Sequence, residues 1–254
     1  MDPLAEARQK AALSDQRWYH RIDLGGGFVT PGENDTQATL ARLRLPARLD
    51  GLSVLDIGAW DGFFAFEAER RGASRVVAID PACWREPAWG ERGWGTKNGF
   101  DLARAALGSS VEDRDLDLLD LSPASIGTFD LVLFLGVLYH LPDPLPYLEA
   151  AASVCRGLLV VETHADLLDV RRPAMAFYPS DEIDGDPSNW WGPNSAALAA
   201  LLAGAGFPQV RVFKEPLAYR IARAIGRRGP HRSRIQQGRI VAHARRSGTA
   251  AFPG

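Results

Sequence analysis

Cysteine is scarce in this sequence. Only two of the 254 residues are cysteines, Cys83 and Cys155, and they form no CxxC pair. Disulfide frameworks and zinc knuckles need several cysteines at short, regular spacings, so the sequence indicates neither kind of protein. Two widely separated cysteines are typical of a protein that works in the reducing cytosol, and we therefore expect a cytoplasmic location.

Long apolar runs are also missing. None reaches the roughly 18 residues that a membrane span requires, and the N-terminal MDPLAEARQK lacks the apolar core of a signal peptide. We therefore expect no membrane partner. The chain has no internal repeat and no low-complexity tract, and with 46% hydrophobic and 24% charged residues it can bury one sizeable core.

Acidic residues are nearly absent from the C-terminal part. From Arg211 onward, eleven Lys or Arg stand against the single acid Glu215, a surplus of +10 that leaves −12 for residues 1–210 because the whole chain carries −2. Such a surplus can steer phosphates or nucleic acid. The alternative is a solvated helix face together with an edge strand, which we favour because aromatic residues are sparse among these cations.

What the sequence does contain is an alternation of short apolar runs with helix-like segments. The predicted strands are Ser53–Ile57, Arg75–Ile79, Val111–Asp115, Phe129–Leu135, Gly157–Glu162, Pro208–Phe213 and Gly238–Ala244. The clearest predicted helices are Phe63–Arg71, Phe100–Leu107, Leu145–Ser153 and Ser195–Ala203. This pattern predicts an α/β fold, a doubly wound Rossmann-like seven-stranded mostly parallel sheet with helices on both faces.

Three segments interrupt the alternation. We expect residues 1–50 to form an N-terminal helical cap or lid, and residues 51–254 to form the main domain with insertions at 81–99 and 163–194, since loops of this length are usually lids or insertions. The insertions hold five tryptophans: Trp84, Trp89, Trp94, Trp190 and Trp191. These rings suit either the wall of an apolar ligand site or packing beneath the loops.

The stretch VLDIGAWDGFFAFEAERRG, residues 54–72, is typical of a strand that passes through a glycine loop into a helix. The strand carries Asp56, Gly58 opens the turn and Gly62 precedes the helix, so backbone N–H groups face any ligand bound there. Asp80 ends the next strand, 22 residues after Gly58, close to the roughly 20-residue spacing of an acid that binds ribose hydroxyls. Together these features predict an adenosine site.

Trp60 discriminates among adenosine ligands. A pyrophosphate needs a glycine in the middle of the loop so that the backbone can approach it, and Trp60 therefore disfavours NAD. S-adenosylmethionine has no phosphate, and an aromatic ring is electrostatically favourable beside its sulfonium. The alternative, compatible with this one, is that Trp60 packs under the N-terminal segment.

Several stretches resemble class I S-adenosylmethionine-dependent methyltransferases. They are VLDIGAWDG, AID ending at Asp80, LLDLSP at 118–123, FDLVLFLGVLYHLPDPL at 129–145 and WWGPNSAALAALLAGAGF at 190–207. More narrowly, they are similar to the branch that includes the tRNA wobble-uridine carboxymethyltransferases and many bacterial relatives. The segment WYHRIDLGGGFVTPG at 18–32 also resembles the entry segment of those bacterial relatives. The resemblance covers roughly residues 18–213 and implies S-adenosyl-L-methionine as the cofactor.

The resemblance also implies roles for single residues. Gly58 and Gly62 would surround the methionine part of the cofactor, and Asp80 would bind its ribose. Asp120 and Leu121 would stand beside adenine, although Asp115 and Asp117 lie close enough in sequence to take that place. Gly136 would lie below the sulfonium. The chain lacks the longer basic N-terminal portion of the tRNA-modifying members and their full set of carboxylate-binding residues, so we do not expect a carboxylated cofactor.

Methyl transfer to a hydroxyl benefits from a base near neutral pKa. The candidate catalytic residues are His140 in GVLYHLPD, Glu162 and His164 in VVETHAD, and His20 in RWYHRI. Glu162 and His164 follow one predicted strand and His140 another, at the edge where such sheets bind ligands. Each also has a packing or capping interpretation. The acid and histidine run offers too few ligands for a metal, so none is expected.

Together these observations predict a methyltransferase that uses S-adenosyl-L-methionine and acts on a small-molecule acceptor, at a hydroxyl of a specialised metabolite or sugar. One alternative is a tRNA wobble-uridine modifying methyltransferase, which the resemblance and the basic C-terminal part favour. The other is a non-catalytic scaffold that binds the cofactor.

Overall fold

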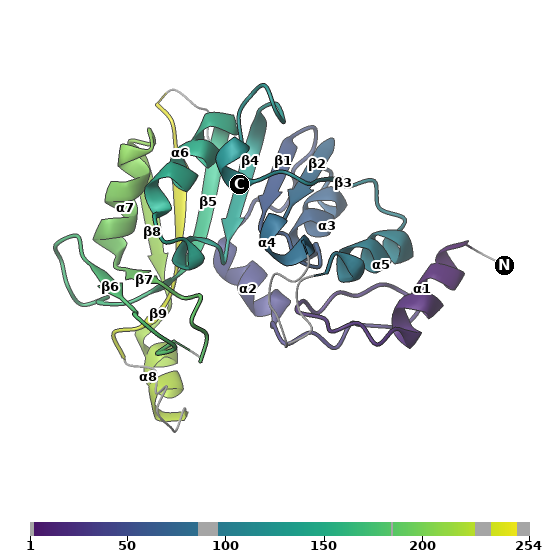
Figure 1. Cartoon of the computed structure of the whole chain (residues 1–254), viewed down its shortest axis with the longest axis horizontal. Coiled ribbons are helices and arrows are strands. Elements are labelled where there is room, and N and C mark those ends of the chain that lie inside the picture. The colour runs from purple at the N-terminus through teal and green to yellow at the C-terminus, as the bar shows by residue number, and fades with distance from the viewer. Residues whose placement is uncertain (1–2, 86–95, 184, 227–234, 248–254) are drawn as a thin grey trace. The chain divides into compact units, whose positions relative to one another are not determined.

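The computed structural model in Figure 1 describes residues 3–85, 96–183, 185–226 and 235–247. The chain divides into two compact units, the first formed chiefly by residues up to Leu118 and the second by residues from Leu119 to Ala251. Each unit is described separately below. Within the described ranges, no helix combines the length and apolar character that crossing a membrane requires.

Seven strands form one sheet. They are β1 (Ser53–Ile57), β2 (Arg75–Ile79), β3 (Glu112–Arg114), β4 (Phe129–Leu135), β5 (Cys155–Ala165), β8 (Gln209–Lys214) and β9 (Gly238–Arg245). Their order is β3-β2-β1-β4-β5-β9-β8. The pairs β1–β2, β2–β3 and β4–β5 are parallel, whereas β9 runs antiparallel to both β5 and β8. The predicted doubly wound, mostly parallel sheet is thereby confirmed.

In its described residues, the first unit adds five α-helices to β1, β2 and β3. They are α1 (Pro3–Leu13), α2 (Thr36–Leu43), α3 (Phe63–Arg70), α4 (Pro81–Trp84) and α5 (Asn98–Leu107). Strand β1 reads SVLDI and is buried along its whole length, including the polar Ser53 and Asp56. Helix α1 packs on α5, where Leu4 approaches Gly108 at the end of α5.

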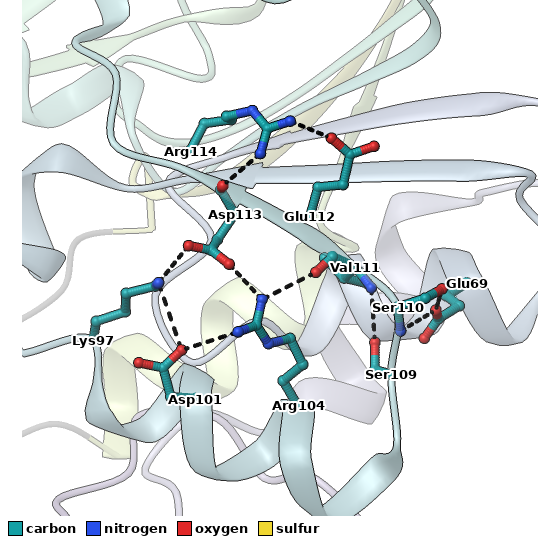
Figure 2. A network of polar contacts seen from close by, with 10 residues as sticks. All are labelled: Glu69, Lys97, Asp101, Arg104, Ser109, Ser110, Val111, Glu112, Asp113 and Arg114. Atoms are coloured by element: carbon teal, nitrogen blue, oxygen red, sulfur yellow. Dashed lines mark hydrogen bonds and ion pairs between the residues drawn. The ribbon is translucent and has the colours of Figure 1, made fainter.

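A polar network fixes α5 beside the edge strand β3 (Figure 2). The Asp113 carboxylate on β3 accepts hydrogen bonds from Lys97, at the start of α5, and from Arg104 within it. Arg104 also forms an ion pair with Asp101, one turn earlier on the same helix. Surface ion pairs of this kind contribute about 1 kcal/mol or less each, so the network orients α5 more than it stabilises the fold.

In the described residues of the second unit, three α-helices and a small ribbon accompany the remaining strands. The helices are α6 (Pro144–Val154), α7 (Ser195–Gly204) and α8 (Leu217–Gly226). Strands β6 (Met175–Phe177) and β7 (Trp191–Pro193) pair antiparallel. Helix α7 begins at the residue where the sequence predicted a helix to begin, and the Asn194 side chain caps it by accepting a hydrogen bond from Ala197 N at 2.8 Å.

Two sequence-based expectations need correction. The strand predicted at Gly157–Glu162 extends to Ala165, because Thr163, His164 and Ala165 pair with the start of β9. The 163–194 connection is not irregular throughout, since it also contains β6 and β7. The helix and edge strand expected in the basic C-terminal part are present as α8 and β8. Trp89 and Trp94 lie outside the described residues.

Candidate functional site

In the first unit, Asp80 holds the glycine loop against the end of β2. Its buried carboxylate accepts hydrogen bonds from Trp60 N and Cys83 N, each at 2.8 Å. Gly58 N donates to Ile79 O at 2.9 Å. These contacts fix the Asp80 carboxylate at the end of β2, beside the loop. Its ribose role stays a prediction.

Asp56 lies beneath the same loop with an unsatisfied oxygen. The residue is 1% exposed, and its Oδ2 has no hydrogen-bond partner among the described residues. Burial, reinforced by the nearby charge of Asp80, raises the pKa of Asp56 to about 7. A buried carboxylate oxygen without a partner is costly, and a cationic ligand group would satisfy it. The ammonium group of S-adenosylmethionine fits this requirement.

Two glycines are required by the geometry of the loop. Gly58 has φ +77° and Gly62 has φ +86°, a backbone conformation that side chains rarely adopt. A Cβ on Gly62 would also lie 2.6 Å from ring atoms of both Phe66 and Phe100. Trp60 itself has φ +49°, in the left-handed region that bulky residues rarely adopt.

Asp61 ties the N-terminal segment to the loop. Its Oδ2 accepts hydrogen bonds from Tyr19 N at 2.6 Å and from His20 N at 3.0 Å. The Tyr19 ring stacks on Trp60 with 4.3 Å between centroids and 13° between planes. Trp60 thus packs against the N-terminal segment, as one of its two interpretations predicted. Its contact with a sulfonium stays a prediction.

His20 lies in the interior of the first unit. Its side chain is buried and its ring meets Phe64 edge-on, with 5.6 Å between centroids. Burial lowers the pKa of His20 to about 3, so the imidazole is neutral at physiological pH. Its catalytic role stays a prediction.

In the second unit, polar and aromatic side chains gather where β4 and β5 end and β9 begins. We call this group the strand-edge cluster; it consists of Tyr139, His140, Glu162, His164, Tyr178 and Arg239. Arg239 binds both oxygens of Glu162, at 2.6 and 2.5 Å, and its guanidinium lies 4.9 Å from the centre of the Tyr139 ring. Because both carboxylate oxygens of Glu162 accept hydrogen bonds from Arg239, we assign Glu162 the role of orienting the Arg239 guanidinium.

The protonation of His140 follows from its neighbours. Its Nδ1 lies 3.2 Å from Ser188 O and 3.0 Å from Ser188 Oγ. A carbonyl oxygen only accepts, so Nδ1 carries the proton and Nε2 carries the lone pair. Burial, with a smaller effect of Arg239, lowers the pKa of His140 to about 4 although Ser188 and Asp186 oppose the shift. The imidazole is therefore neutral at physiological pH.

His164 belongs to a hydrogen-bonded chain that sequence reasoning missed. Its Nε2 lies 3.2 Å from the Tyr178 hydroxyl, which donates to Asp166 Oδ2 at 2.8 Å. Tyr178 directly follows β6, and its position gave no signal that it would reach the end of β5. In the described part of the chain, no group of three His, Cys, Asp or Glu side chains is placed to hold a metal ion.

The remaining predicted cofactor residues lie in the second unit. Asp120 is exposed and Leu121 is buried. Gly136, at φ +73°, donates its N–H to Glu162 O at 2.9 Å. A Cβ placed on Gly136 would lie 3.9 Å from both Arg239 Nη2 and the Tyr139 hydroxyl, so this position borders the strand-edge cluster. Their contacts with a cofactor stay predictions.

In the first unit, the two alternatives to Asp120 are already engaged. Arg85 binds Asp115 at 2.8 Å and Asp117 at 2.9 Å. Contact of Asp120 with adenine stays a prediction.

Comparison with known proteins yields a family and several relatives. The sequence pattern of the family described as a methyltransferase domain matches residues 33–212. The tRNA U34 carboxymethyltransferase of Chromohalobacter salexigens is 30% identical over 172 residues, which is 66% of this chain and 47% of that protein. The same enzyme of Dichelobacter nodosus is 34% identical over 163 residues, 63% of this chain and 46% of that protein. The chain thus spans about half the length of these relatives.

Solved structures share the fold. The N-terminal domain of EvdMO1, crystallised in the presence of SAH and D-fucose, superposes with a TM-score of 0.65 at 20% identity, covering 97% of both chains. The 1,6-didemethyltoxoflavin-N1-methyltransferase of Burkholderia thailandensis has a TM-score of 0.53 at 20% identity, covering 85% of this chain and 82% of that one. At this level of identity, the similarity concerns the fold.

Proposed function

The chain belongs to the methyltransferase domain family, and on that premise we propose that it transfers a methyl group from S-adenosyl-L-methionine to a small-molecule acceptor. The proposed acceptor atom is a hydroxyl oxygen of a specialised metabolite or sugar. The observation that carries the acceptor assignment is the neutral His140, whose Nε2 holds a lone pair inside the strand-edge cluster.

Five residues of the first unit would bind the cofactor. Asp80, at the end of β2 beside the loop, would bind the ribose hydroxyls, and Oδ2 of Asp56, which has no partner among the described residues, suits the ammonium group. Gly58 and Gly62 let the loop approach the methionine part, while Trp60 forms the wall beside the sulfonium. When bound, the cofactor supplies an electrophilic methyl group. In the second unit, Asp120, Leu121 and Gly136 keep the roles that the resemblance implies.

The strand-edge cluster would bind the acceptor. His140 Nε2 accepts a hydrogen bond from a hydroxyl of the acceptor next to the one that is methylated, and the ring keeps its orientation because Ser188 holds Nδ1. Tyr139 stacks under the Arg239 guanidinium, and together they offer a flat surface with polar donors at one side. Positioning of this kind supplies much of the rate enhancement in a transfer between two bound reactants.

A tRNA wobble uridine is the second candidate acceptor. It is supported by the relatives named for that activity, of which the Chromohalobacter salexigens enzyme is 30% identical. Against it stands the −12 charge of residues 1–210, which repels a polyanion. A cofactor-binding scaffold without catalysis is the third candidate.

The test is transfer of labelled methyl from S-adenosylmethionine to a panel of hydroxylated small molecules, sugars included, and to bulk tRNA. We expect label in at least one small molecule and none in tRNA. His140→Gln should slow the transfer on the order of 10²-fold, while His243→Gln, a change elsewhere in the second unit, should leave it intact. Label in tRNA alone would establish the second candidate. Cofactor binding without transfer to either class would establish the third.

A further inference from the structure

The chain of contacts behind His164 fixes where its protons lie. Tyr178 has one hydroxyl proton, and it donates that proton to Asp166 Oδ2 at 2.8 Å. Toward His164, the same hydroxyl oxygen has only its lone pairs to offer. The contact between His164 Nε2 and this oxygen, 3.2 Å long, is therefore a hydrogen bond donated by the imidazole.

Asp166 is held as an acceptor by other donors as well. Leu167 N donates to Oδ1 at 2.6 Å, and Gln237 Nε2 donates to Oδ2 at 3.0 Å. Asp166 is 5% exposed and Tyr178 is 8% exposed, so their hydrogen bond is shielded from water. Together with the Tyr178 hydroxyl, these donors give the two oxygens of Asp166 three hydrogen bonds to accept.

Gly192 makes room for this arrangement. A Cβ at position 192 would lie 2.5 Å from the Tyr178 hydroxyl oxygen and 2.9 Å from Asp166 Cβ. Any side chain there would separate the hydroxyl from the carboxylate. Gly192 lies on β7 and Tyr178 directly follows β6, so the β6–β7 ribbon places the Tyr178 hydroxyl beside the end of β5. The β6–β7 ribbon thus has a specific structural task.

We infer that Tyr178 and Asp166 are positioning residues, which hold His164 as the Nε2–H tautomer and so make its Nδ1 the atom that takes the proton of the acceptor. This inference rests on the proposed function. It sets His164 apart from His140, whose contact with Ser188 O imposes the opposite tautomer. The cluster then contains one histidine that orients the acceptor and one that receives its proton.

The step balances. The acceptor oxygen forms a bond to the methyl carbon as the carbon–sulfur bond breaks, and that bonding pair stays on sulfur. The hydroxyl proton passes to Nδ1 of His164, which becomes an imidazolium and later releases the proton to solvent. Nε2–H of this imidazolium remains bonded to Tyr178, whose link to the Asp166 carboxylate stabilises the positive charge.

The direct test is a two-bond ¹H–¹⁵N correlation spectrum of the whole protein labelled at histidine nitrogens, recorded near neutral pH without cofactor. This spectrum distinguishes the two imidazole tautomers, and the variants His164→Gln and His140→Gln identify the two signals by their loss. We expect the Nε2–H pattern for His164 and the Nδ1–H pattern for His140. An Nδ1–H pattern for His164 would overturn the inference, whatever the chain methylates.

Three variants test the cause. Tyr178→Phe removes the oxygen that accepts from Nε2 and should mix the tautomers of His164, and Gly192→Ala should do the same by displacing that oxygen. Tyr219→Phe makes the same chemical change on α8, where the residue is 56% exposed, and should leave the spectrum unaltered. An unchanged His164 pattern in a folded Tyr178→Phe protein, with folding checked by circular dichroism, would refute the positioning role.

Methyl transfer gives a second readout once an acceptor is in hand. His164→Gln should slow it about 10²- to 10⁴-fold, the range expected for a lost general base, with unchanged binding of S-adenosylhomocysteine. A wild-type rate in His164→Gln would contradict the proton-accepting role even if the tautomer is as inferred. Because the spectrum needs neither cofactor nor acceptor, failure of the inference and failure of the proposed function remain distinguishable.

Discussion

At the scale of single residues, the first unit concentrates three buried carboxylates around one loop. Asp61 and Asp80 accept backbone hydrogen bonds, whereas Oδ2 of Asp56 is unsatisfied in the described structure. Burial raises the pKa of Asp56 to about 7 and that of Asp61 to about 6, and it raises the pKa of Asp80 as well. Such a cluster is unfavourable by itself and suits a site that binds a cation.

The raised pKa of Asp56 predicts a pH dependence of stability. Its value is about 7 in the folded protein against the ordinary 3.8, so the folded state binds a proton that the unfolded state has already lost. The contribution of Asp56 to stability is therefore complete below about pH 4 and is lost as the pH rises through about 7. Thermal unfolding should show that the stability of Asp56→Asn, relative to that of the wild type, increases between pH 5 and pH 8.

The control for this prediction is Asp15→Asn, because Asp15 is exposed. It should follow the wild type at every pH. The same substitution at Asp56 should weaken the binding of S-adenosylhomocysteine at pH 8, since the ammonium group loses its charged acceptor. A parallel pH dependence in the wild type and Asp56→Asn would show that Asp56 is not the group that titrates.

The sequence predicted the first-unit residues better than those of the strand-edge cluster. Asp56, Gly58 and Gly62 lie within one short stretch whose strand, turn and helix are locally determined. Arg239 and Tyr178 reach the cluster from distant segments, through the pairing of β5 with β9 and the β6–β7 ribbon. Local patterns carry no information about such pairings, and these two residues were missed for that reason.

At the scale of elements, the interior strands were the easiest to predict. Strands β1, β2 and β4 were located with their observed bounds, since nearly all their residues are buried and apolar. The edge strand β3 is shorter than predicted, because its residues are not buried. The strands of the ribbon, MAF and WGP, are too short for any periodicity to show.

The N-terminal segment and the 163–194 connection are expected to respond to the cofactor. In amide hydrogen exchange, residues 1–35 and 163–194 should exchange quickly in the free protein and slow down with S-adenosylhomocysteine, as gating segments do. The amides of Tyr19 and His20 should respond most within the first segment, because both donate to Asp61 beside the loop.

Strand β4 provides the internal reference for this experiment. Its residues are almost all buried, and we expect its protection to be high in both states. Equal protection of the two segments with and without ligand would identify them as static parts of the fold rather than lids.

At the scale of the whole molecule, the uneven charge decides between acceptor classes. The sequence offers six arginines in the basic C-terminal part as candidates for phosphate contacts: Arg220, Arg223, Arg227, Arg228, Arg232 and Arg234. If they bound tRNA, affinity would fall steeply with salt because phosphate contacts release counterions. We expect instead that replacing several of them by glutamine leaves methyl transfer to the small-molecule acceptor largely unchanged.

Filter binding of unfractionated tRNA at low and moderate salt checks this expectation at little cost. The account predicts weak binding that does not saturate. Saturable, salt-sensitive binding that disappears in the arginine variants would make tRNA, rather than a small molecule, the favoured acceptor.

The central claim is that the glycine loop and its carboxylates form a site for S-adenosylmethionine and not for a dinucleotide, and calorimetry tests it most directly. We predict that S-adenosylhomocysteine binds the wild-type protein and NAD does not. Asp80→Ala should weaken the binding by about 1.5–3 kcal/mol, the value of hydrogen bonds to a charged group, while Asp15→Asn should leave it unchanged. Tight binding of NAD, or S-adenosylhomocysteine binding that is indifferent to Asp80→Ala, would contradict the account.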